Sequence, residues 1–333
     1  MKIQFSFIIP VYNRPQQIKE LLESFTLLTS NDPFEIVIIE DGSTHCSSEI
    51  IASYQDVLDI SYHQKPNTGP GDSRNFGMKL AKGNYFIILD SDVLLPPDYL
   101  QQVSVFLEQN YVDCFGGADT AHYSFTKIQK AINYTMTSFF TTGGIRGSKK
   151  TVQHFEPRSF NMGISRKAFK ATSGFAKIHP GEDPDLSHRI LKAGFKTVFI
   201  PKIAVFHKRR ISWRSFLIQV TKFGLVRPIL NQWHPQGAKI TFWLPTLFVC
   251  FTLISLSLSV FYHWLFLLPL VSYVVIVLVE ASVKTKSLVI GFMAILAMFI
   301  QFFGYGYGFF KSVVYIQWLK KDPQKQFPRL FFK

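Results

Sequence analysis

The sequence predicts an α/β fold, a mainly parallel sheet with flanking helices, followed by a C-terminal α-helical transmembrane region. Two observations lead to this prediction. Short apolar runs alternate with helical patterns up to about residue 207, as units with parallel strands require. The stretch from Thr241 to Phe310 is then almost continuously apolar, and segments of about twenty apolar residues cross membranes.

The four expected strands and the helices between them follow in order. Strands are expected at Phe5–Val11, Phe34–Ile39, Ile60–His63 and Tyr85–Leu89, and helices from Pro15 to about Leu28, up to about Val57, and from the Gly-rich loop Asn67–Asn75 to Ala81. The first helix begins with Pro15, as helix N-termini often do. This alternation requires a parallel sheet with right-handed crossovers.

The fourth strand ends in two aspartates. It is bracketed by Gly83 and Pro96, which is typical of a central strand buried on both faces. Asp90 and Asp92 follow it, and ligands of open α/β sheets bind outside the carboxyl ends of the strands. The pair therefore predicts a site for a hard divalent cation that carries substrate phosphates. A solvated turn with a helix N-cap at Asp92 or Asp98 is the alternative.

Polar residues also end the first two strands, at Asn13 and Asp41. Their convergence with the aspartate pair on one edge is hard to obtain by chance. A dinucleotide-binding domain would place Gly-x-Gly-x-x-Gly after the first strand, but Tyr12-Asn-Arg-Pro15 contains no glycine there. NAD is therefore not expected.

Composition narrows the class of protein further. The formal net charge is +14, but the chain has no basic and aromatic recognition module for nucleic acid, and Lys and Arg concentrate near the apolar segments. An anionic membrane surface explains this charge better. Cys46, Cys114 and Cys250 have no metal-ligand or redox spacing, which indicates a reducing compartment. The run Ile3 to Val11 lacks a cleavage site, so no signal peptide is expected.

Five motifs occur in one order along the chain. They are Pro10-Val-Tyr-Asn13, Glu40-Asp-Gly-Ser43, Gly69-Pro-Gly-Asp-Ser-Arg-Asn75, Asp90-Ser-Asp92 and Gly181-Glu-Asp-Pro-Asp-Leu186. Together they resemble the inverting glycosyltransferases of family 2, over about residues 3 to 207. The resemblance implies the GT-A nucleotide-diphospho-sugar transferase fold. It also implies transfer of a sugar from a UDP- or GDP-linked donor to an acceptor hydroxyl, with Mg²⁺ or Mn²⁺ as cofactor.

The resemblance also assigns binding residues. Pro10, Tyr12 and Asn13 would line the nucleoside pocket, and Asp41 would hold the base. Arg74 would lie near the nucleotide and behind the aspartates. His207 matches a position where some relatives place a diphosphate or metal contact, although a lone histidine is more often structural.

The chemistry of the residues agrees with this activity. Negative charge builds on a departing diphosphate, and a metal held by Asp92 with Asp90 would supply positive charge as Lewis acid and template. Arg74 would add a fixed cation. A structural salt bridge from Arg74 to Asp41 or Asp90 is the alternative.

An inverting displacement also needs a base for the acceptor proton. The cluster Glu182-Asp-Pro-Asp185 is the candidate. In the family motif the residue after the glutamate is the base, which assigns the role to Asp183, with Glu182 orienting it or touching the acceptor. The alternative is an ordinary helix N-terminus, where the dipole stabilises acidic residues.

Two further segments have open interpretations. Ser138 to Lys150 is expected to be a basic loop that closes over the diphosphate or meets an anionic acceptor, unless it is simply solvated. Phe160–Ser165 is similar to the short strand that lies under the acceptor site in the family.

The predicted domains are a GT-A catalytic domain at 1–207, a basic amphipathic interfacial helix and linker at 208–240, about three transmembrane helices at 241–310, and a basic tail at 311–333. The alternative is that the amphipathic helix packs on the soluble domain. Arg209, Arg210 and Arg227 are candidates for contact with an acceptor phosphate.

The expected membrane segments are Phe242–Tyr262, Trp264–Val279 and Leu288–Phe310. Lys284 and Lys286 fit a cytoplasmic loop, but a third crossing would put the basic tail outside, against the positive-inside rule. A re-entrant or interfacial third segment is the alternative to three crossings.

These observations predict a multi-pass enzyme of the inner, cytoplasmic membrane with a cytoplasmic catalytic domain. Its acceptor would be a lipid-linked glycan or surface-polysaccharide precursor of the cell envelope. Two alternatives remain: an enzyme that loads a sugar onto polyprenyl phosphate, and a non-catalytic membrane scaffold with the same fold.

Overall fold

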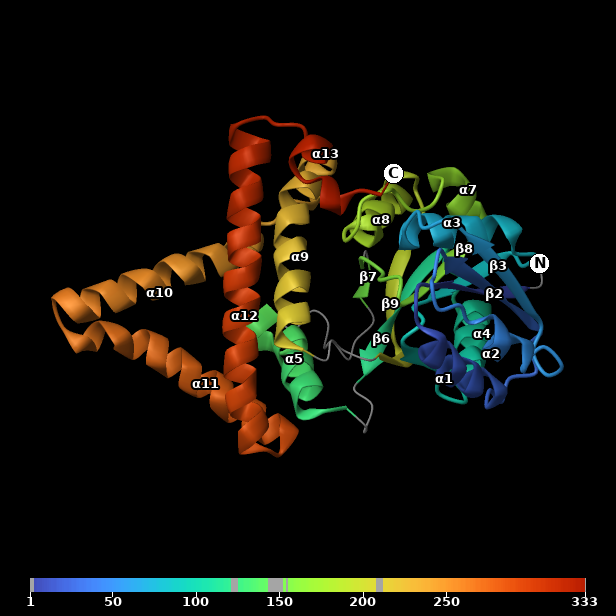
Figure 1. Ribbon diagram of the computed structural model, residues 1–333, viewed down its shortest axis with the longest axis horizontal. Coiled ribbons are helices and arrows are strands. Elements are labelled where there is room, and N and C mark those ends of the chain that lie inside the picture. The colour runs from blue at the N-terminus through green and yellow to red at the C-terminus, as the bar shows by residue number, and fades with distance from the viewer. Residues whose placement is uncertain (1–2, 121–124, 143–151, 154, 208–211, 333) are drawn as a thin grey trace. The chain divides into compact units, whose positions relative to one another are not determined.

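The structure is a computed structural model that describes residues 3–120, 125–142, 152–153, 155–207 and 212–332. The chain forms two compact units (Figure 1). The sheet unit comprises residues 1–122, 149–207 and 331–333, and the helical unit comprises residues 123–148 and 208–330. Residues 123–148 lie inside the predicted catalytic domain but belong to the helical unit, because α5 packs its apolar face among the long helices.

The described residues of the sheet unit form one nine-stranded sheet. Its strands are β1 (Phe5–Val11), β2 (Phe34–Asp41), β3 (Ile60–Lys65), β4 (Tyr85–Leu89), β5 (Val93–Leu94), β6 (Cys114–Thr120), β7 (Val152–Gln153), β8 (Asn161–Ser165) and β9 (Thr197–His207). Its helices are α1 (Pro15–Thr26), α2 (Ser48–Ala52), α3 (Pro70–Leu80), α4 (Tyr99–Gln109), α7 (Arg166–Thr172) and α8 (Glu182–Lys192).

The strand order is β3-β2-β1-β4-β8-β6-β9-β5, and β7 pairs with β9. The four strands predicted from the sequence, β1 to β4, are parallel to one another as expected. Beyond β4 the sheet is mixed, since β8 is antiparallel to both β4 and β6. The parallel half therefore brings the carboxyl ends of β1, β2, β3 and β4 to one edge.

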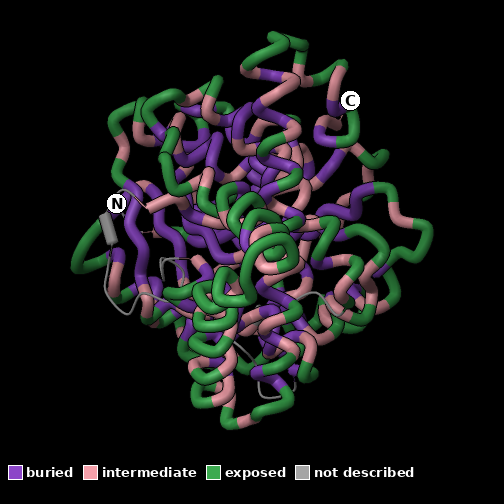
Figure 2. Tube along the Cα trace, turned by 90° about the vertical axis from the view of Figure 1, so that its left-hand side faces the viewer, coloured by how far each residue is buried: buried purple, intermediate pink, exposed green. Residues whose placement is uncertain are grey.

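Both faces of the sheet are covered, which explains the continuous apolar runs of its central strands. Along β4, Tyr85, Ile87 and Leu89 join the core under α1, α2 and α4, whereas Phe86 and Ile88 join the core under α3, α7 and α8. The buried residues of the strands are purple in Figure 2. The predicted α/β sheet with flanking helices is thus confirmed, but the sheet is mixed rather than mainly parallel, because β5, β7 and β8 pair antiparallel.

The helical unit holds the apolar part of the chain. Its elements are α5 (Lys127–Thr137), α6 (Phe139–Thr142), α9 (Trp213–Trp233), η2 (Pro235–Gly237), η3 (Ile240–Trp243), α10 (Leu244–Phe261), η4 (Trp264–Leu267), α11 (Leu268–Thr285), α12 (Leu288–Ser312), the π-helix η5 (Val313–Trp318), α13 (Pro323–Gln326) and η6 (Pro328–Leu330). Among the residues that the structure describes, three spans are long and apolar enough to cross a membrane, at Ile240–Phe261, Trp264–Thr285 and Leu288–Trp318.

Glycines let α12 approach its neighbours closely. A Cβ at Gly304 would lie 2.7 Å from Cγ2 of Val220 on α9, and a Cβ at Gly306 would lie 2.9 Å from the carbonyl oxygen of Pro245 on α10. Such small residues are the usual contact points of membrane helices. The helix predicted at the membrane surface, α9, therefore packs along α12, and Phe216 and Val220 are buried.

The second span continues beyond the predicted end at Val279, through Glu280 to Thr285. The Glu280 carboxylate accepts hydrogen bonds from the Tyr134 and Ser138 hydroxyls and pairs with Lys284 at 2.5 Å. A charge in an apolar helix is costly unless it is paired. These partners explain why the helix does not end where the sequence pattern places its end.

Candidate active site

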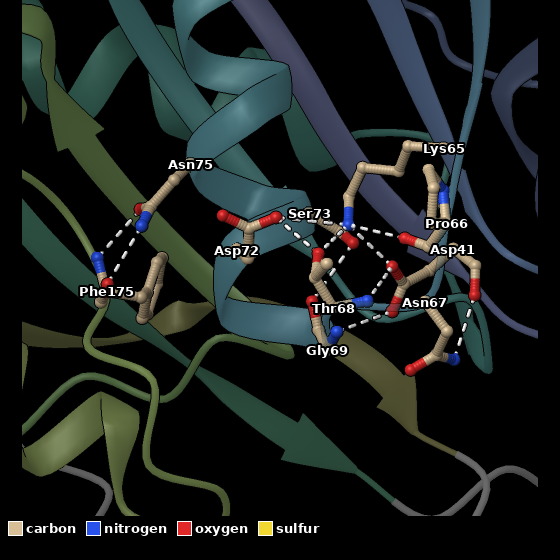
Figure 3. A network of polar contacts seen from close by, with 10 residues as sticks. All are labelled: Asp41, Lys65, Pro66, Asn67, Thr68, Gly69, Asp72, Ser73, Asn75 and Phe175. Carbon is tan, nitrogen blue, oxygen red and sulfur yellow. Dashed lines mark hydrogen bonds and ion pairs between the residues drawn. The ribbon is translucent and has the colours of Figure 1, made fainter. Parts of the chain in front are cut away.

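The carboxylate of Asp41, the last residue of β2, holds a loop that we call the Asp41 loop, residues 65–69 (Figure 3). Oδ1 accepts hydrogen bonds from Nζ of Lys65 at 2.6 Å and from the backbone N–H of Thr68 at 3.0 Å. Oδ2 accepts from the backbone N–H of Gly69 at 2.9 Å. Lys65 also lies 3.1 Å from Asp72 on α3. The predicted base-binding carboxylate thus sets the shape of the loop that opens α3.

Tyr12 and Asn13 follow β1 at the same edge. Asn13 has a left-handed backbone (φ 53°), and its side-chain oxygen accepts hydrogen bonds from the backbone N–H groups of Thr44, at 2.8 Å, and His45, at 3.0 Å. It therefore ties the end of β1 to the turn after β2. The Tyr12 ring is 51% exposed, and Pro10 is half-buried. An exposed aromatic ring of this kind can stack on a nucleobase.

Arg74 on α3 is buried and bridges two carboxylates. Its guanidinium lies 2.8 Å from Asp90 and 3.2 Å from Glu182, and it stands over the Phe175 ring at 5.3 Å. The salt bridge to Asp90 that the sequence left as an alternative is therefore present. Arg74 joins the aspartates after β4 to the acidic cluster at the start of α8.

Arg14 was not singled out in the sequence, yet it pairs with Asp92 at 2.6 Å. It follows Asn13 directly, so its place at the strand edge was a signal that could have identified it. Lys65 was missed for a similar reason, because its register opposite Asp41 becomes visible only once β2 and β3 are paired. Asp41, Asp90 and Asp92 are thus each paired with a cation.

Asp183 lies in the first turn of α8, with Glu182 before it. Its Oδ2 accepts a hydrogen bond from the backbone N–H of Ser159 at 3.1 Å. Oδ1 is buried and has no hydrogen-bond partner among the residues that the structure describes. One oxygen of the Asp183 carboxylate is therefore not held by a hydrogen bond from the described residues.

The two neighbouring carboxyls titrate far apart. Burial and then the charge of Glu182 raise the pKa of Asp183 to about 6, against the opposing effects of Arg74 and Arg158. Burial would also raise the pKa of Glu182, but His179, whose Nδ1 lies 2.8 Å from Oε1, and Arg74 outweigh it and lower that pKa to about 2. Separated pKa values in a pair of acids distinguish a proton acceptor from a permanent charge.

Asp90 and Asp92 offer oxygen ligands of the kind that Mg²⁺ and Mn²⁺ prefer, and one or two protein carboxylates suffice when phosphates and water complete the shell. The residues that the structure describes include no group of three or more His, Cys, Asp or Glu that could hold a metal. Asp90 and Asp92 would therefore hold such a cation only together with oxygens of a bound diphosphate and water. His207 is the last residue of β9 and pairs with Val93 of β5. Val93 is the residue that follows Asp92.

Other predicted residues belong to the helical unit or fall outside the described residues. Arg227 belongs to the helical unit, where its guanidinium lies 4.3 Å from the centre of the Phe242 ring. Arg209, Arg210 and residues 143–150 of the predicted basic loop lie outside the described residues. The start of that loop forms the short helix α6.

Comparison with known proteins identifies the family. The model of the family described as "Glycosyl transferase family 2" matches residues 6–172, half of the chain. An uncharacterized glycosyltransferase of Rickettsia felis is 38% identical over 136 residues, which are 41% of this chain and 22% of that protein. Poly(ribitol-phosphate) beta-N-acetylglucosaminyltransferase TarS of Staphylococcus aureus is 32% identical over 116 residues, 33% of this chain and 20% of TarS. The matches thus span about a fifth of these relatives.

Solved structures share the fold. Residues 1–349 of S. aureus TarS in complex with UDP-GlcNAc superpose with a TM-score of 0.51 at 17% identity, covering 95% of this chain and 92% of that chain. The mannosyltransferase PcManGT of Pyrobaculum calidifontis, in complex with GDP-Man and Mn²⁺, gives a TM-score of 0.56 at 14% identity, covering 96% and 89%. The predicted GT-A fold is confirmed.

Proposed function

Because this chain belongs to glycosyl transferase family 2, we propose that it transfers a sugar from a nucleotide diphosphate to a hydroxyl of a lipid-linked or surface-polysaccharide precursor, with inversion. The observation that carries this proposal is the buried, unpartnered Oδ1 of Asp183, within the described part of the chain, one residue from the Glu182–Arg74–Asp90 chain of ion pairs. It combines a proton acceptor with a charged site for a diphosphate.

In the proposed reaction, Asp183 takes the proton of the acceptor hydroxyl as its oxygen attacks the anomeric carbon. The new bond to the acceptor forms while the bond from the anomeric carbon to the phosphate oxygen breaks, and the nucleoside diphosphate leaves. Asp90 and Asp92 would hold Mg²⁺ or Mn²⁺, which supplies positive charge to the diphosphate when bound. Arg74 keeps Asp90 and Glu182 in place.

The donor is proposed to be a UDP- or GDP-linked sugar. The two fold relatives were solved with UDP-GlcNAc and GDP-Man. Tyr12 provides an exposed ring for stacking, and the Asp41 loop lies at the same strand edge. Asp41, Asn13 and Pro10 are therefore proposed to surround the nucleoside.

A panel of UDP- and GDP-sugars tests this proposal, screened with Mg²⁺, Mn²⁺ or EDTA by thermal shift and by release of the nucleoside diphosphate. We expect one of the donors to raise the melting temperature of the detergent-solubilised full chain. This stabilisation should require Mg²⁺ or Mn²⁺ and should be lost in EDTA. Asp92→Asn should abolish that stabilisation, whereas Asp98→Asn, at an exposed position on the same connection, should keep it. Donor binding that is equally strong in EDTA would rule out the metal.

We also infer a membrane topology with an even number of crossings. Residues 331 and 332 belong to the sheet unit, in which Phe331 forms a β-bridge with Ile178. The chain must therefore return to the side of the membrane from which it left after residue 207. Three crossings would not return it, whereas crossings by α10 and α11 alone would. The basic tail then stays on the catalytic side, as the positive-inside rule prefers.

In the proposed topology α12 lies along the catalytic side of the bilayer. Its exposed apolar residues recur at helical spacing and make one stripe: Leu288, Val289, Phe292, Leu296, Phe303, Tyr307 and Phe310. Helices that lie in the interface show such one-sided faces. The first two candidate spans are exposed on more of their surface, since only 17% of the residues in the most apolar part of each are buried.

Cysteine labelling with an impermeant maleimide in intact spheroplasts and in inverted vesicles checks the topology. Exposed Cys46 serves as the native marker of the catalytic side, after replacement of Cys250. A cysteine at Gln324 is expected to react together with Cys46, and a cysteine at His263, between α10 and α11, on the opposite side. Reaction of the Gln324 position together with the His263 position would establish a third crossing.

A further inference from the structure

Residues 331 and 332 are attached to the sheet unit by their backbone. Phe331 pairs with Ile178 in an antiparallel bridge, and the backbone N–H of Phe332 donates to the carbonyl oxygen of Lys177 at 3.0 Å. This attachment places the Phe332 side chain at a defined position on the unit, half-buried.

The Phe332 ring lies directly on Gly69, the residue before α3. A Cβ built on Gly69 would overlap the ring, so only glycine leaves room for it there. Gly69 also has a backbone φ of 95°, which glycine adopts without steric cost. The chain thus has a flat backbone surface where the ring packs.

The other neighbour of the ring is His179, with ring centres 6.0 Å apart. His179 follows the bridge residue Ile178 and contacts Glu182, which precedes the proposed base. Asn75 on α3 holds the beginning of the same segment through two hydrogen bonds with the Phe175 backbone, at 2.7 and 2.8 Å (Figure 3). Phe332 is therefore placed to hold its end.

One ring thus touches both halves of the proposed site. The ring packs on Gly69, whose backbone N–H donates a hydrogen bond to Asp41 in the proposed nucleoside pocket. The ring also lies against His179, which contacts the carboxylate of Glu182 beside Asp183. We propose that Phe332 is a positioning residue that fixes the Asp41 loop against the 175–179 segment in the geometry that binds the nucleoside diphosphate of the donor.

This inference rests on the proposed function and concerns donor binding rather than proton transfer. Removing the ring would leave Gly69 and His179 without their shared neighbour, and the donor would have to order the two segments when it binds. That cost falls on binding before any chemistry, so it raises KM for the donor. The reacting groups themselves are not altered.

Kinetics of Phe332→Ala and Phe332→Leu in the full-length protein test this role, with Phe76→Ala as a matched control. Phe76 is also a phenylalanine of the sheet unit, but it lies on the exposed side of α3, against His63. Phe332→Ala is expected to raise the donor KM about tenfold with kcat within about twofold of the wild type. Phe332→Leu should recover most of the affinity, and Phe76→Ala should leave both constants unchanged.

Three results would overturn the role of Phe332. They are an unchanged donor KM in Phe332→Ala, a lower KM, which would mean that the ring blocks the site, and an equal rise in Phe76→Ala. If Phe332→Ala fails to fold, Phe332→Leu decides, because a folded leucine variant whose donor KM equals that of the wild type would also overturn the role. A wild-type protein that transfers no sugar from any donor would instead refute the proposed function.

Discussion

Replacing Asp183 with asparagine is expected to lower kcat for sugar transfer by about 10³-fold, within the range that general bases contribute. Asparagine keeps the shape and can still accept the Ser159 N–H hydrogen bond, but it cannot take a proton. Donor binding should persist, because the donor is held elsewhere in the proposed site. Initial rates of transfer and donor-induced thermal shifts measure the two effects separately.

The pH profile is the accompanying control. Since the pKa of Asp183 is raised to about 6, wild-type kcat should increase as pH rises through about 6 and the carboxyl ionises. A carboxyl whose pKa is higher in the folded protein than in the unfolded chain stabilises the fold at low pH, and this stability is lost as pH rises through the folded value. Asp183→Asn should therefore be at least as stable as the wild type at pH 7.5. Activity that survives in Asp183→Asn would exclude this residue as the base.

Replacing Arg74 with methionine is expected to have the largest effect on stability. It would leave Asp90 and Glu182 without the cation between them and remove the contact with the Phe175 ring. Removing one partner of a buried ion pair typically costs about 3–5 kcal/mol. For a domain of this size that corresponds to a fall in Tm on the order of 10 °C, measured by thermal unfolding in detergent.

The matched control is Arg189→Met, which breaks the ion pair of 2.6 Å with buried Asp185. Both variants should lose stability, but only the Arg74 variant should also lose donor affinity at a temperature where both are folded. Arg74→Lys should keep the charge without bridging both carboxylates, since an ammonium lacks the planar fork of a guanidinium. Equal donor affinity in the two methionine variants would make Arg74 a purely structural residue.

The parallel half of the sheet, β1 to β4, could be predicted because its hydrophobic pattern is local in the sequence. The β4 run alternates between two cores, and the residues that follow β1, β2 and β4 carry the polar side chains of the site. The partners of those side chains could not be predicted in the same way. Arg14 and Lys65 are paired by contacts between segments far apart in the sequence, such as Arg14 with Asp92, whereas His179 pairs with Glu182 three residues further on.

In the helical unit, the end of the second candidate membrane span could not be predicted from the sequence. Sequence hydropathy ended the second span at Val279, because the next residue is an acid. The structure continues it because Tyr134 and Ser138, from a segment about 140 residues earlier, bind that acid. A charge in an apolar helix can therefore be interpreted only when its partner is known.

Gly308 of α12 and Gly224 of α9 lie where the two helices meet backbone to backbone. At these positions α12 meets α9 with backbone rather than with long side chains: a Cβ on Gly224 of α9 would clash with the backbone of Tyr305, and one on Gly308 with that of Thr221. A seam of this kind has no rotamers through which the two helices could slide. The pair should respond to changes in the surrounding lipid as one stiff rod, so a tilt imposed on the apolar stripe of α12 is carried over in full to α9.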